Sequence, residues 1–409
     1  MINIRFTGKT EVHFKDIIKS LITVLISTFL IVACAGNPWN NSQQGSFVDN
    51  KDYGDAKIVC AAYIALWGVY DPVTKRNRDW TAEDIGTNLL TDLILSFATL
   101  SDKDHVTLEL DEYNNYKATV DRLHARNKDL RISLAIGGAS EGVDDFSAMA
   151  ASSTLRGKFV ANVKDFLKKN KSISGIDIDW EYPGKSGSSS QKQKDIDNYI
   201  LLLKELKLMM NNLGAENGIN YRLTTALPAD RRNLIENISE IQKYLDGINL
   251  MMYDYHGSWS DETGHNAPLD ETEAALQKYL AAGASPEKIV FGVPFYGQRW
   301  ENVKADFNHP DGLGVSVNHN YSADYGIAYP EILELLKNTN YTKYWDDDAK
   351  APYLYSSKDK VFVSYNDERS IEHIIKVVQD NNLGGMMTWE YGQDMTLSLL
   401  KVMYKGCTE

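Results

Sequence analysis

The sequence predicts an α/β fold, a (β/α)8 TIM barrel with a small α+β insertion between its seventh and eighth strands. From Lys57 onward, short apolar runs alternate with segments whose apolar residues recur at helical spacing. Eight such runs occur over about 350 residues, which is the repeat number of the barrel. Near-continuous apolar runs such as residues 248–253 are typical of parallel strands that are covered on both faces.

The predicted strands and helices alternate along the chain. Residues 153–170 carry an apolar helical stripe that includes Phe159 and Val163, and residues 194–213 carry one that includes Leu203 and Met210. Gly214 is expected to end the second helix, because glycine tolerates the left-handed backbone of a helix C-terminus. The expected strands are residues 57–64, 92–99, 130–137, 173–181, 221–228, 247–254, 289–295 and 384–389.

A doubly wound open sheet is the alternative architecture. That fold would place a glycine-rich phosphate loop after its first strand, whereas residues 61–67 read Ala-Ala-Tyr-Ile-Ala-Leu-Trp. The long gap before the last strand contains a turn signal at 309–312, a helical pattern at 330–337 and strand-like runs at 352–355 and 361–365. We therefore expect a catalytic barrel at residues 56–300 and 361–405, and an α+β insertion domain at 301–360.

The N-terminal residues carry the pattern of an exported lipoprotein. Residues 21–33 form an apolar run that follows four Lys and Arg residues; it is short for a membrane span but typical of a signal-peptide core. The run ends in Val-Ala-Cys34, which resembles a bacterial lipobox and makes Cys34 the expected lipidation site. A buried helix is the alternative for this run, but a polar stretch follows it. We predict a signal peptide at 1–33, a tether at 34–55, and a lipid anchor in the bacterial cell envelope or at its surface.

Composition excludes several classes of partner and site. The net charge of −13 opposes binding to nucleic acid, whose phosphates would be repelled. Apart from Cys34, the cysteines are Cys60 and Cys407, which are distant in sequence and predict no disulfide framework. Neither HExxH nor CxxC spacing occurs, so we predict no catalytic metal and no cofactor.

The run Gly175-Ile-Asp-Ile-Asp-Trp-Glu-Tyr-Pro183 indicates an acid/base enzyme. Alternate side chains of a strand share one face, so Asp177, Asp179 and Glu181 are expected on one side and apolar residues on the other. Neighbouring carboxylates raise the cost of ionising all three. An edge strand carrying solvated charges is the alternative, but it does not explain the Ile and Trp residues between the acids. Pro183 ends the strand just after Glu181, at the end where barrels carry out chemistry.

This motif resembles the family 18 glycoside hydrolases, specifically their chitinase branch. That family has an Asp-Gly followed by alternating Asp, Asp and Glu, and residues 174–181 here match it with Ser174 at the first position. The resemblance runs from about Lys57 to Leu400. Its other matches are Tyr63 and Trp67, Ala135-Ile-Gly-Gly138, Met251-Met-Tyr-Asp254, Pro294-Phe-Tyr-Gly297 and Gly384-Gly-Met-Met-Thr-Trp389.

The resemblance implies retaining hydrolysis in which the 2-acetamido oxygen of the sugar attacks, forming an oxazolinium ion. Glu181 would protonate the glycosidic oxygen and then activate water. Asp179 would orient the acetamido N–H, and Asp177 would keep Asp179 and Glu181 from ionising together. Tyr253 would hydrogen-bond the acetamido group.

The resemblance also implies the residues that bind the sugar. Trp389 would form the floor under the distorted ring, and Trp67 would stack on a more distant sugar. Core packing is the alternative for Phe97 and Met251, and a tight turn for Gly138. The full predicted binding set is Tyr63, Trp67, Phe97, Gly138, Tyr182, Met251, Asp254, Tyr296, Arg299 and Trp389.

The chain departs from the family pattern at several positions. Ser174 replaces the first Asp, and Ala135 replaces a Ser that commonly bonds the innermost Asp, so Asp177 is expected to depend on Tyr63. Ala139 stands where a Trp often stacks on the product-side sugar. Gln298-Arg299 shifts the usual Arg by one position.

The favoured function is cleavage of β-1,4-linked N-acetylglucosamine in chitin or its oligosaccharides by a monomer. An endo-β-N-acetylglucosaminidase that acts on glycoprotein glycans is the second enzyme hypothesis. A non-catalytic chitin-binding lectin on the same scaffold is the third, although the acid Glu181 is retained here.

Overall fold

The computed structural model describes residues 57–71, 73–100, 106–110, 116–139, 143–185, 187–317 and 326–409. The predicted signal peptide at 1–33, the tether at 34–55 and the lipidation site Cys34 lie outside these residues. Within them, none of the helices combines the length and the apolar character needed to span a membrane.

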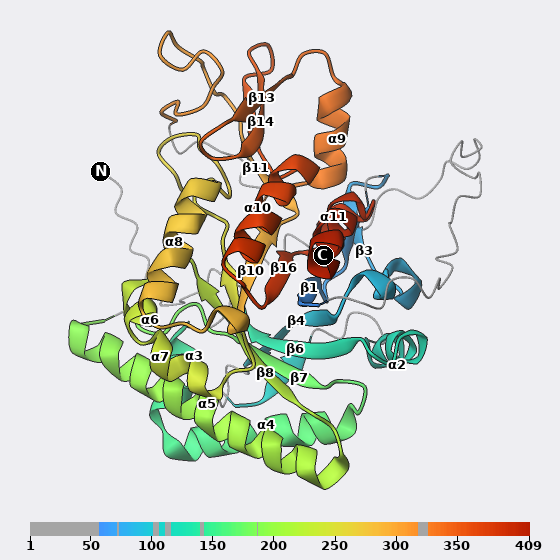
Figure 1. Ribbon diagram of the computed structural model, residues 1–409, viewed down its shortest axis with the longest axis vertical. Helices are drawn as coiled ribbons and strands as arrows, with labels where there is room; N and C mark the ends of the chain where they lie inside the picture. The colour runs from blue at the N-terminus through green and yellow to red at the C-terminus, as the bar shows by residue number, and fades with distance from the viewer. Residues whose placement is uncertain are drawn as a thin grey trace, which may run out of the picture. The chain divides into compact units, whose positions relative to one another are not determined.

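Eight parallel strands close into a barrel (Figure 1). Each strand pairs with the next in the order β1-β16-β10-β9-β8-β7-β6-β4, and β4 returns to pair with β1, so these eight strands form a closed ring. The eight strands predicted from the apolar runs are thereby confirmed. Their bounds are β1 Val59–Ala65, β4 Asp92–Leu100, β6 Arg131–Gly137, β7 Gly175–Asp179, β8 Arg222–Pro228, β9 Gly247–Met251, β10 Ile289–Pro294 and β16 Gly385–Trp389.

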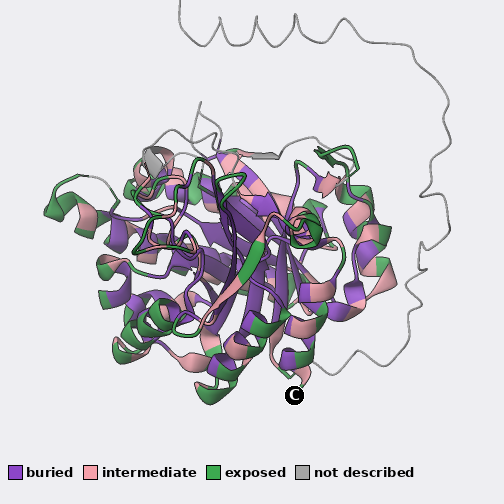
Figure 2. Cartoon of the chain, turned by 90° about the horizontal axis from the view of Figure 1, so that it is seen from above, coloured by how far each residue is buried: buried purple, intermediate pink, exposed green. Residues whose placement is uncertain are grey.

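Helices surround the strands, and Figure 2 shows buried strands at the centre with the exposed faces of the helices outside them. The helices that belong to the barrel are α2 Tyr116–Arg126, α3 Val143–Ala151, α4 Ser153–Lys169, α5 Ser189–Asn217, α6 Arg232–Glu236, α7 Ile238–Ile241, α8 Leu269–Ala281, α10 Glu368–Asp380 and α11 Ser398–Thr408. Short 3-10 turns occur at Ala82–Asp84, Thr87–Leu89, Gln242–Tyr244, Pro286–Lys288 and Tyr391–Asp394.

The expected end of the second predicted helix is wrong. Helix α5 continues through Gly214 to Asn217 and is capped by Gly218, whose φ of 77° is left-handed and whose N–H donates to the Gly214 carbonyl. A Cβ atom at position 214 would lie 2.5 Å from the Ile219 carbonyl oxygen. Gly214 therefore lets the chain after the helix pass close to its last turns, while Gly218 supplies the cap.

Strand alternation divides the barrel residues between two clusters. Ala61, Tyr63 and Ile94 belong to the cluster inside the barrel, together with Met387 of β16. Side chains of the opposite parity, such as Ile64, join the larger core between strands and helices. The packed interior supports the C-terminal ends of the strands, where functional groups of such barrels are found.

The insertion is a five-stranded sheet of order β12-β11-β15-β14-β13 with helix α9, Tyr329–Lys337. Its pairs are antiparallel, and the sheet has its own apolar cluster that includes Trp300 and Phe362. The sheet extends beyond 301–360 on both sides, because β11 follows β10 after a single residue and pairs with β15. The strand bounds are β11 Tyr296–Trp300, β12 Ile327–Ala328, β13 Thr342–Asp346, β14 Ala351–Ser356 and β15 Val361–Ser364.

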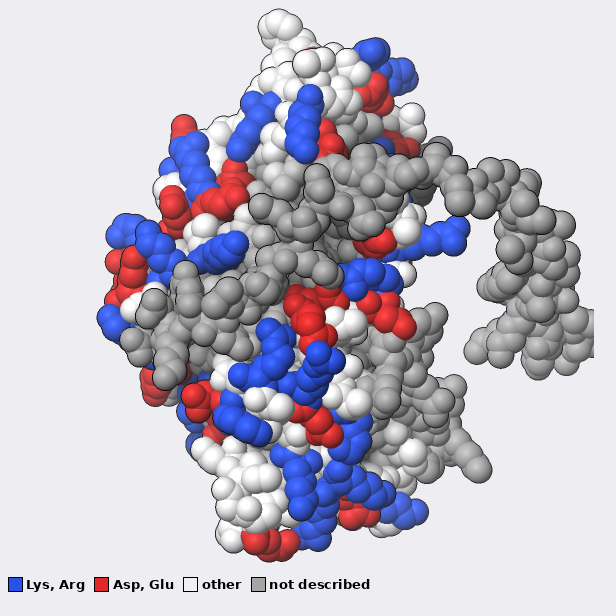
Figure 3. Space-filling view, turned by 90° about the vertical axis from the view of Figure 1, so that its right-hand side faces the viewer, with Lys and Arg blue, Asp and Glu red and all other residues white. Residues whose placement is uncertain are grey.

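A hairpin and a short strand are attached to the ends of β1 and β4. Strands β2 Val69–Asp71 and β3 Arg76–Arg78 form an antiparallel hairpin after β1, and β5 Leu108–Leu110 pairs with the end of β4. Figure 3 shows basic and acidic side chains interspersed over one face of the molecule. The acidic surplus is thus not gathered into a single patch on that face.

Candidate active site

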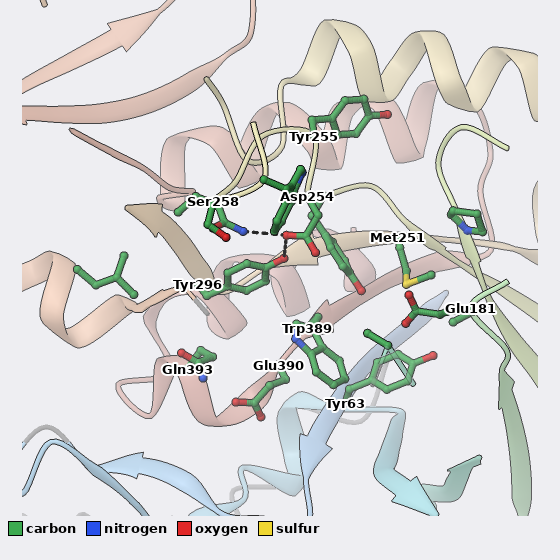
Figure 4. Close-up of a pocket in the computed structure, with 18 of the residues that line it drawn as sticks. Tyr63, Glu181, Met251, Asp254, Tyr255, Ser258, Tyr296, Trp389, Glu390 and Gln393 are labelled. Carbon is green, nitrogen blue, oxygen red and sulfur yellow. Dashed lines mark hydrogen bonds between the residues drawn. The ribbon is translucent and has the colours of Figure 1, made fainter. Parts of the chain in front are cut away.

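A cavity of about 1320 Å³ opens at the C-terminal ends of the barrel strands. Trp389 lies between Glu181 on one side and Gln393 on the other (Figure 4). Twelve of the residues predicted for catalysis or binding line this cavity: Tyr63, Trp67, Phe97, Asp179, Glu181, Tyr182, Met251, Tyr253, Asp254, Tyr296, Arg299 and Trp389.

Strand β7 divides the acid run by parity as predicted. Ile176, Ile178 and Trp180 are buried in the core between strands and helices. Asp177 and Asp179 have the opposite parity and are directed into the barrel, and Glu181 follows the last residue of the strand. The strand geometry thus places the three carboxyl groups in succession from the barrel interior to the cavity.

Asp177 is completely buried and is held by three side chains. Its carboxylate accepts hydrogen bonds from Tyr63 Oη at 2.8 Å, Thr224 Oγ1 at 2.5 Å and Asn249 Nδ2 at 3.1 Å. Burial raises the pKa of Asp177 to about 6, and the three hydrogen bonds oppose that effect. The group is therefore poised to hold or release a proton near neutral pH.

Asp179 is also buried, but its Oδ1 atom has no hydrogen-bond partner among the described residues. Burial raises its pKa well above the ordinary value, and the charges of Glu181 and Asp177 raise it further. A buried acceptor without a donor carries a large desolvation cost. The unpaired oxygen beside the cavity is suited to receive a donor from a ligand.

Glu181 combines burial with nearby cations. Burial is the largest cause that raises its pKa, and the charge of Asp254 acts in the same direction. A hydrogen bond with Tyr182 and the charges of Lys185 and Arg231 lower the pKa. With Asp179 also raised, the pair retains a proton to higher pH than two isolated carboxyl groups would. A retained proton is what a general acid needs.

A second polar group lines the cavity after strand β9. Asp254 has a left-handed backbone (φ 63°), and its N–H donates to Asn266 Oδ1 at 2.9 Å. Its carboxylate accepts from Tyr296 Oη at 2.5 Å and Gln298 Nε2 at 3.0 Å (Figure 4). These bonds fix the carboxylate at the wall of the cavity. Burial raises the pKa of Tyr253, and the charge of Asp179 raises it further, so its hydroxyl remains a donor.

An aromatic cluster forms the floor of the cavity. The rings of Phe97 and Trp389 stack with centroids 5.5 Å apart, and those of Trp67 and Phe97 with centroids 6.2 Å apart. The centroid of the Tyr63 ring, which belongs to the cluster inside the barrel, lies 5.7 Å from that of Trp389. Trp67 remains 42% exposed, which leaves a ring face available to a ligand. Aromatic faces of this kind suit the C–H surfaces of a sugar ring.

The family model for glycosyl hydrolases family 18 matches residues 58–394. That span includes the acid run, the aromatic floor and the whole insertion. The chain belongs to glycosyl hydrolase family 18. It is a glycoside hydrolase of the chitinase branch, as the resemblance of its motifs predicted.

Relatives of known sequence and structure agree with this family. The chain is 32% identical over 374 residues to Probable chitinase 2 of Drosophila melanogaster, covering 85% of this chain and 74% of that protein. It is 32% identical over 301 residues to Chitinase A1 of Niallia circulans, covering 68% of this chain and only 43% of that longer protein.

Two solved structures share the fold closely. A family 18 N-acetylglucosaminidase from Paenibacillus barengoltzii superposes with a TM-score of 0.72 at 30% identity, covering 85% of this chain and 99% of that one. The Group IV chitinase of Ostrinia furnacalis gives a TM-score of 0.74 at 27% identity, covering 86% of this chain and all of that one.

Two predicted binding residues occupy less direct positions. Gly138 is not among the residues that line the cavity; its N–H donates to the Asp179 carbonyl at 2.8 Å, and a Cβ atom there would lie 2.7 Å from the Phe97 ring. It therefore allows the turn and the close packing of Phe97. Arg299 lines the cavity, but its guanidinium pairs with Glu301 at 2.8 Å. In this hydrolase Gln298, rather than Arg299, bonds Asp254.

Several residues of the site were missed in the sequence. Asn249 and Thr224 donate hydrogen bonds to the Asp177 carboxylate. The guanidinium carbon of Arg231 lies 4.3 Å from the centroid of the Tyr182 ring. Asn249 carried a usable signal, since it is the one polar residue of the apolar run 248–252. Thr224 and Arg231 carried none. Among the described residues, no group of three His, Cys, Asp or Glu side chains is arranged to hold a metal ion.

Proposed function

We propose that this hydrolase cleaves β-1,4-linked N-acetylglucosamine in chitin or chitooligosaccharides, with retention, through an oxazolinium intermediate. The observation that supports the proposal most strongly is the Oδ1 atom of Asp179 beside Glu181, for which the described part of the chain supplies no hydrogen-bond donor. An acetamido N–H is a donor of the right chemistry for this buried acceptor. The related Group IV chitinase of Ostrinia furnacalis has also been solved in complex with allosamidin.

The proposed reaction begins with a proton transfer from Glu181 to the glycosidic oxygen. The carbonyl oxygen of the substrate's own acetamido group attacks the anomeric carbon as the leaving sugar departs. Such an intramolecular nucleophile has a high effective concentration and replaces an enzyme carboxylate. Asp179 accepts the N–H hydrogen bond and stabilises the positive charge of the oxazolinium ion. Glu181 then removes a proton from the water that opens the ring.

Asp177, on β7, and Tyr253, after β9, assist these reaction steps. Asp177 exchanges its proton with the Asp179–Glu181 pair, and its three hydrogen bonds hold it in line with them. The Tyr253 hydroxyl, in the segment after β9, donates to the acetamido oxygen and aims it at the anomeric carbon. Trp389 supports the distorted ring from below.

The decisive experiment compares turnover of a chromogenic N,N′-diacetylchitobioside by the wild type, Glu181→Gln and Glu271→Gln. Glu271 also lines the cavity but lies on α8, away from the acid run. We expect Glu181→Gln to lose at least about a hundredfold in kcat and Glu271→Gln to stay near wild type. Proton NMR of the first product should show the β-anomer, and the matching cellobioside should not be cleaved.

Other outcomes would assign the site differently. Equal rates for the wild type and Glu181→Gln, or an α-anomeric first product, would refute the proposed mechanism. Release of glycans from a glycoprotein without action on chitin oligomers would assign an endo-β-N-acetylglucosaminidase. Tight binding of chitin oligomers without turnover by the wild type would assign a lectin.

We further propose that the protein is exported and anchored by a lipid on Cys34. The support is the sequence pattern of residues 21–34, which lies outside the described residues. Metabolic labelling with a fatty acid should mark the wild-type chain in bacterial cells and leave Cys34→Ala unlabelled. Equal labelling of the two chains would refute the assignment.

A further inference from the structure

The two cysteines of the described chain, Cys60 and Cys407, lie at opposite ends of the sequence but in neighbouring elements. Cys60 is on β1, where strand alternation directs Ala61 and Tyr63 into the barrel and Cys60 outward toward the helices. Cys407 is in the last turn of α11, which packs against β1. Both residues are buried and both are free thiols in this structure.

Backbone hydrogen bonds join the two segments at this point. The Cys407 carbonyl accepts from the Lys57 N–H at 2.9 Å and from the Ile58 N–H at 3.4 Å. The Cys407 thiol donates to the carbonyl of Val59, the residue directly before Cys60, at 3.4 Å. The end of the last helix is therefore fixed to the start of the first strand within one residue of Cys60.

The two side chains are also close to each other. The Cys60 thiol donates to the Leu89 carbonyl at 3.4 Å. Burial raises the pKa of Cys60 well above the ordinary value, and Cys407 raises it further through a side-chain hydrogen bond and its charge. The two thiols are thus neighbours in one apolar environment that shields them from bulk solvent, and its burial keeps the Cys60 thiol protonated.

We propose that Cys60 and Cys407 form an intrachain disulfide that ties the C-terminal helix to the first barrel strand. The oxidant is a disulfide, either of a small molecule such as oxidised glutathione or of a thiol–disulfide oxidoreductase. Cys407 reacts first, because opening the last turn of α11 exposes it without disturbing the barrel. The raised pKa of Cys60 is consistent with a thiol that reacts only after its partner has been activated.

The chemistry balances in two exchange steps. The deprotonated Cys407 sulfur attacks one sulfur of the oxidant, forming a mixed disulfide and releasing one thiolate. As the helix end closes again, the Cys60 sulfur, having given up its proton, attacks the Cys407 sulfur and displaces the second thiolate. The two cysteines lose two protons and two electrons, and the oxidant takes them up as two thiols.

The position of this bond gives it a structural consequence. The ring that it closes contains all eight barrel strands and the insertion, from Cys60 to Cys407. A cross-link over so long a loop removes much conformational freedom from the unfolded chain and stabilises the folded one. The distance between the cysteines along the chain, which predicted no disulfide, does not matter here because barrel closure brings the two termini of the domain together.

The experiment uses the full chain with Cys34→Ser, so that only the proposed pair remains. The reduced protein is exposed to oxidised glutathione, unfolded and treated with an alkylating agent, while a second sample is digested without reduction. We expect both cysteines to resist alkylation, a Cys60–Cys407 linked peptide, and a Tm about 4 °C above that of the reduced protein. Cys60→Ser and Cys407→Ser, each in the same background, should show no difference between oxidised and reduced samples.

Three results would overturn the proposal. They are full alkylation of both cysteines after exposure, a glutathione adduct on either cysteine without the linked peptide, and a linked form whose Tm equals that of the reduced form. The comparison of oxidised with reduced protein needs neither cysteine of the pair to be replaced. It therefore decides the question even if the serine variants do not fold.

Discussion

Replacing Asp177 with Asn should make the protein more stable at neutral pH while lowering its activity. Asp177 is fully buried and has a pKa of about 6 in the folded state, against an ordinary value of 3.8. The unfolded chain therefore releases this proton first as the pH rises. A group whose pKa is raised by folding contributes stability at low pH and loses it as the pH rises toward the folded pKa.

The size of the effect follows from the two pKa values. At 1.36 kcal/mol per unit of pKa, the whole difference is about 3 kcal/mol. Between pH 4.5 and pH 7.5, the ionisation of Asp177 should remove about 2 kcal/mol of stability from the wild type. An Asn at this position cannot ionise and can still accept the bonds from Thr224 and Asn249. Asp177→Asn should therefore gain about 2 kcal/mol relative to the wild type over this pH range.

Urea unfolding followed by tryptophan fluorescence at the two pH values measures this difference. Asp348→Asn, at an exposed position in the turn between β13 and β14, is the control and should follow the wild type. Turnover of the chitobioside by Asp177→Asn should fall by at least about tenfold, because the acid pair loses its proton partner. Parallel pH profiles of the unfolding free energy for Asp177→Asn and the wild type would refute the reasoning.

Three further substitutions test other parts of the site. Tyr296→Phe removes the 2.5 Å hydrogen bond to Asp254 and should lower kcat/KM for the chitobioside about tenfold. The control Tyr255→Phe, also at the cavity wall, should change kcat/KM little. Lys185→Gln removes a charge that lowers the pKa of Glu181, so the alkaline limb of the kcat/KM profile should move to higher pH. The control Lys194→Gln, at an exposed position on α5, should leave the limb in place. A movement of the limb to lower pH in Lys185→Gln would contradict the assignment. Gly138→Ala places a Cβ atom 2.7 Å from the Phe97 ring at a φ of 101° and should lower the unfolding free energy by about 1–3 kcal/mol. The control Gly157→Ala, inside α4 with open space around it, should raise the unfolding free energy by up to about 1 kcal/mol. Similar values for the two variants would show that the Phe97 ring moves aside without cost.

The acid run illustrates how much a local pattern can predict. Its parity alone predicted that Asp177 and Asp179 share one face and that Trp180 lies on the other, because successive side chains of a strand must point to opposite faces; the structure shows Trp180 in the outer core. The pattern did not identify Thr224 and Asn249 as the partners of Asp177. Those residues come from β8 and β9, and their approach to Asp177 depends on the stagger of strands around the closed barrel.

Helix ends and the reach of the insertion also depended on tertiary contacts. The sequence pattern placed the end of the second helix at Gly214, whereas the path of the chain after α5 puts the cap at Gly218. The run at 361–364 was assigned to the barrel, but its backbone pairs with β11 and β14 of the insertion sheet. A strand's partners are set by the whole sheet rather than by its own residues.

The sequence by itself determined the eight barrel strands, the acid run and the family, because each depends on residues a few positions apart. Tertiary structure decided which groups tune those acids, that Gln298 rather than Arg299 holds Asp254, and that Cys60 and Cys407 are neighbours. These contacts join residues that are distant along the chain. The contact between Cys60 and Cys407, for example, forms only when the barrel closes and brings its first strand against its last strand and last helix.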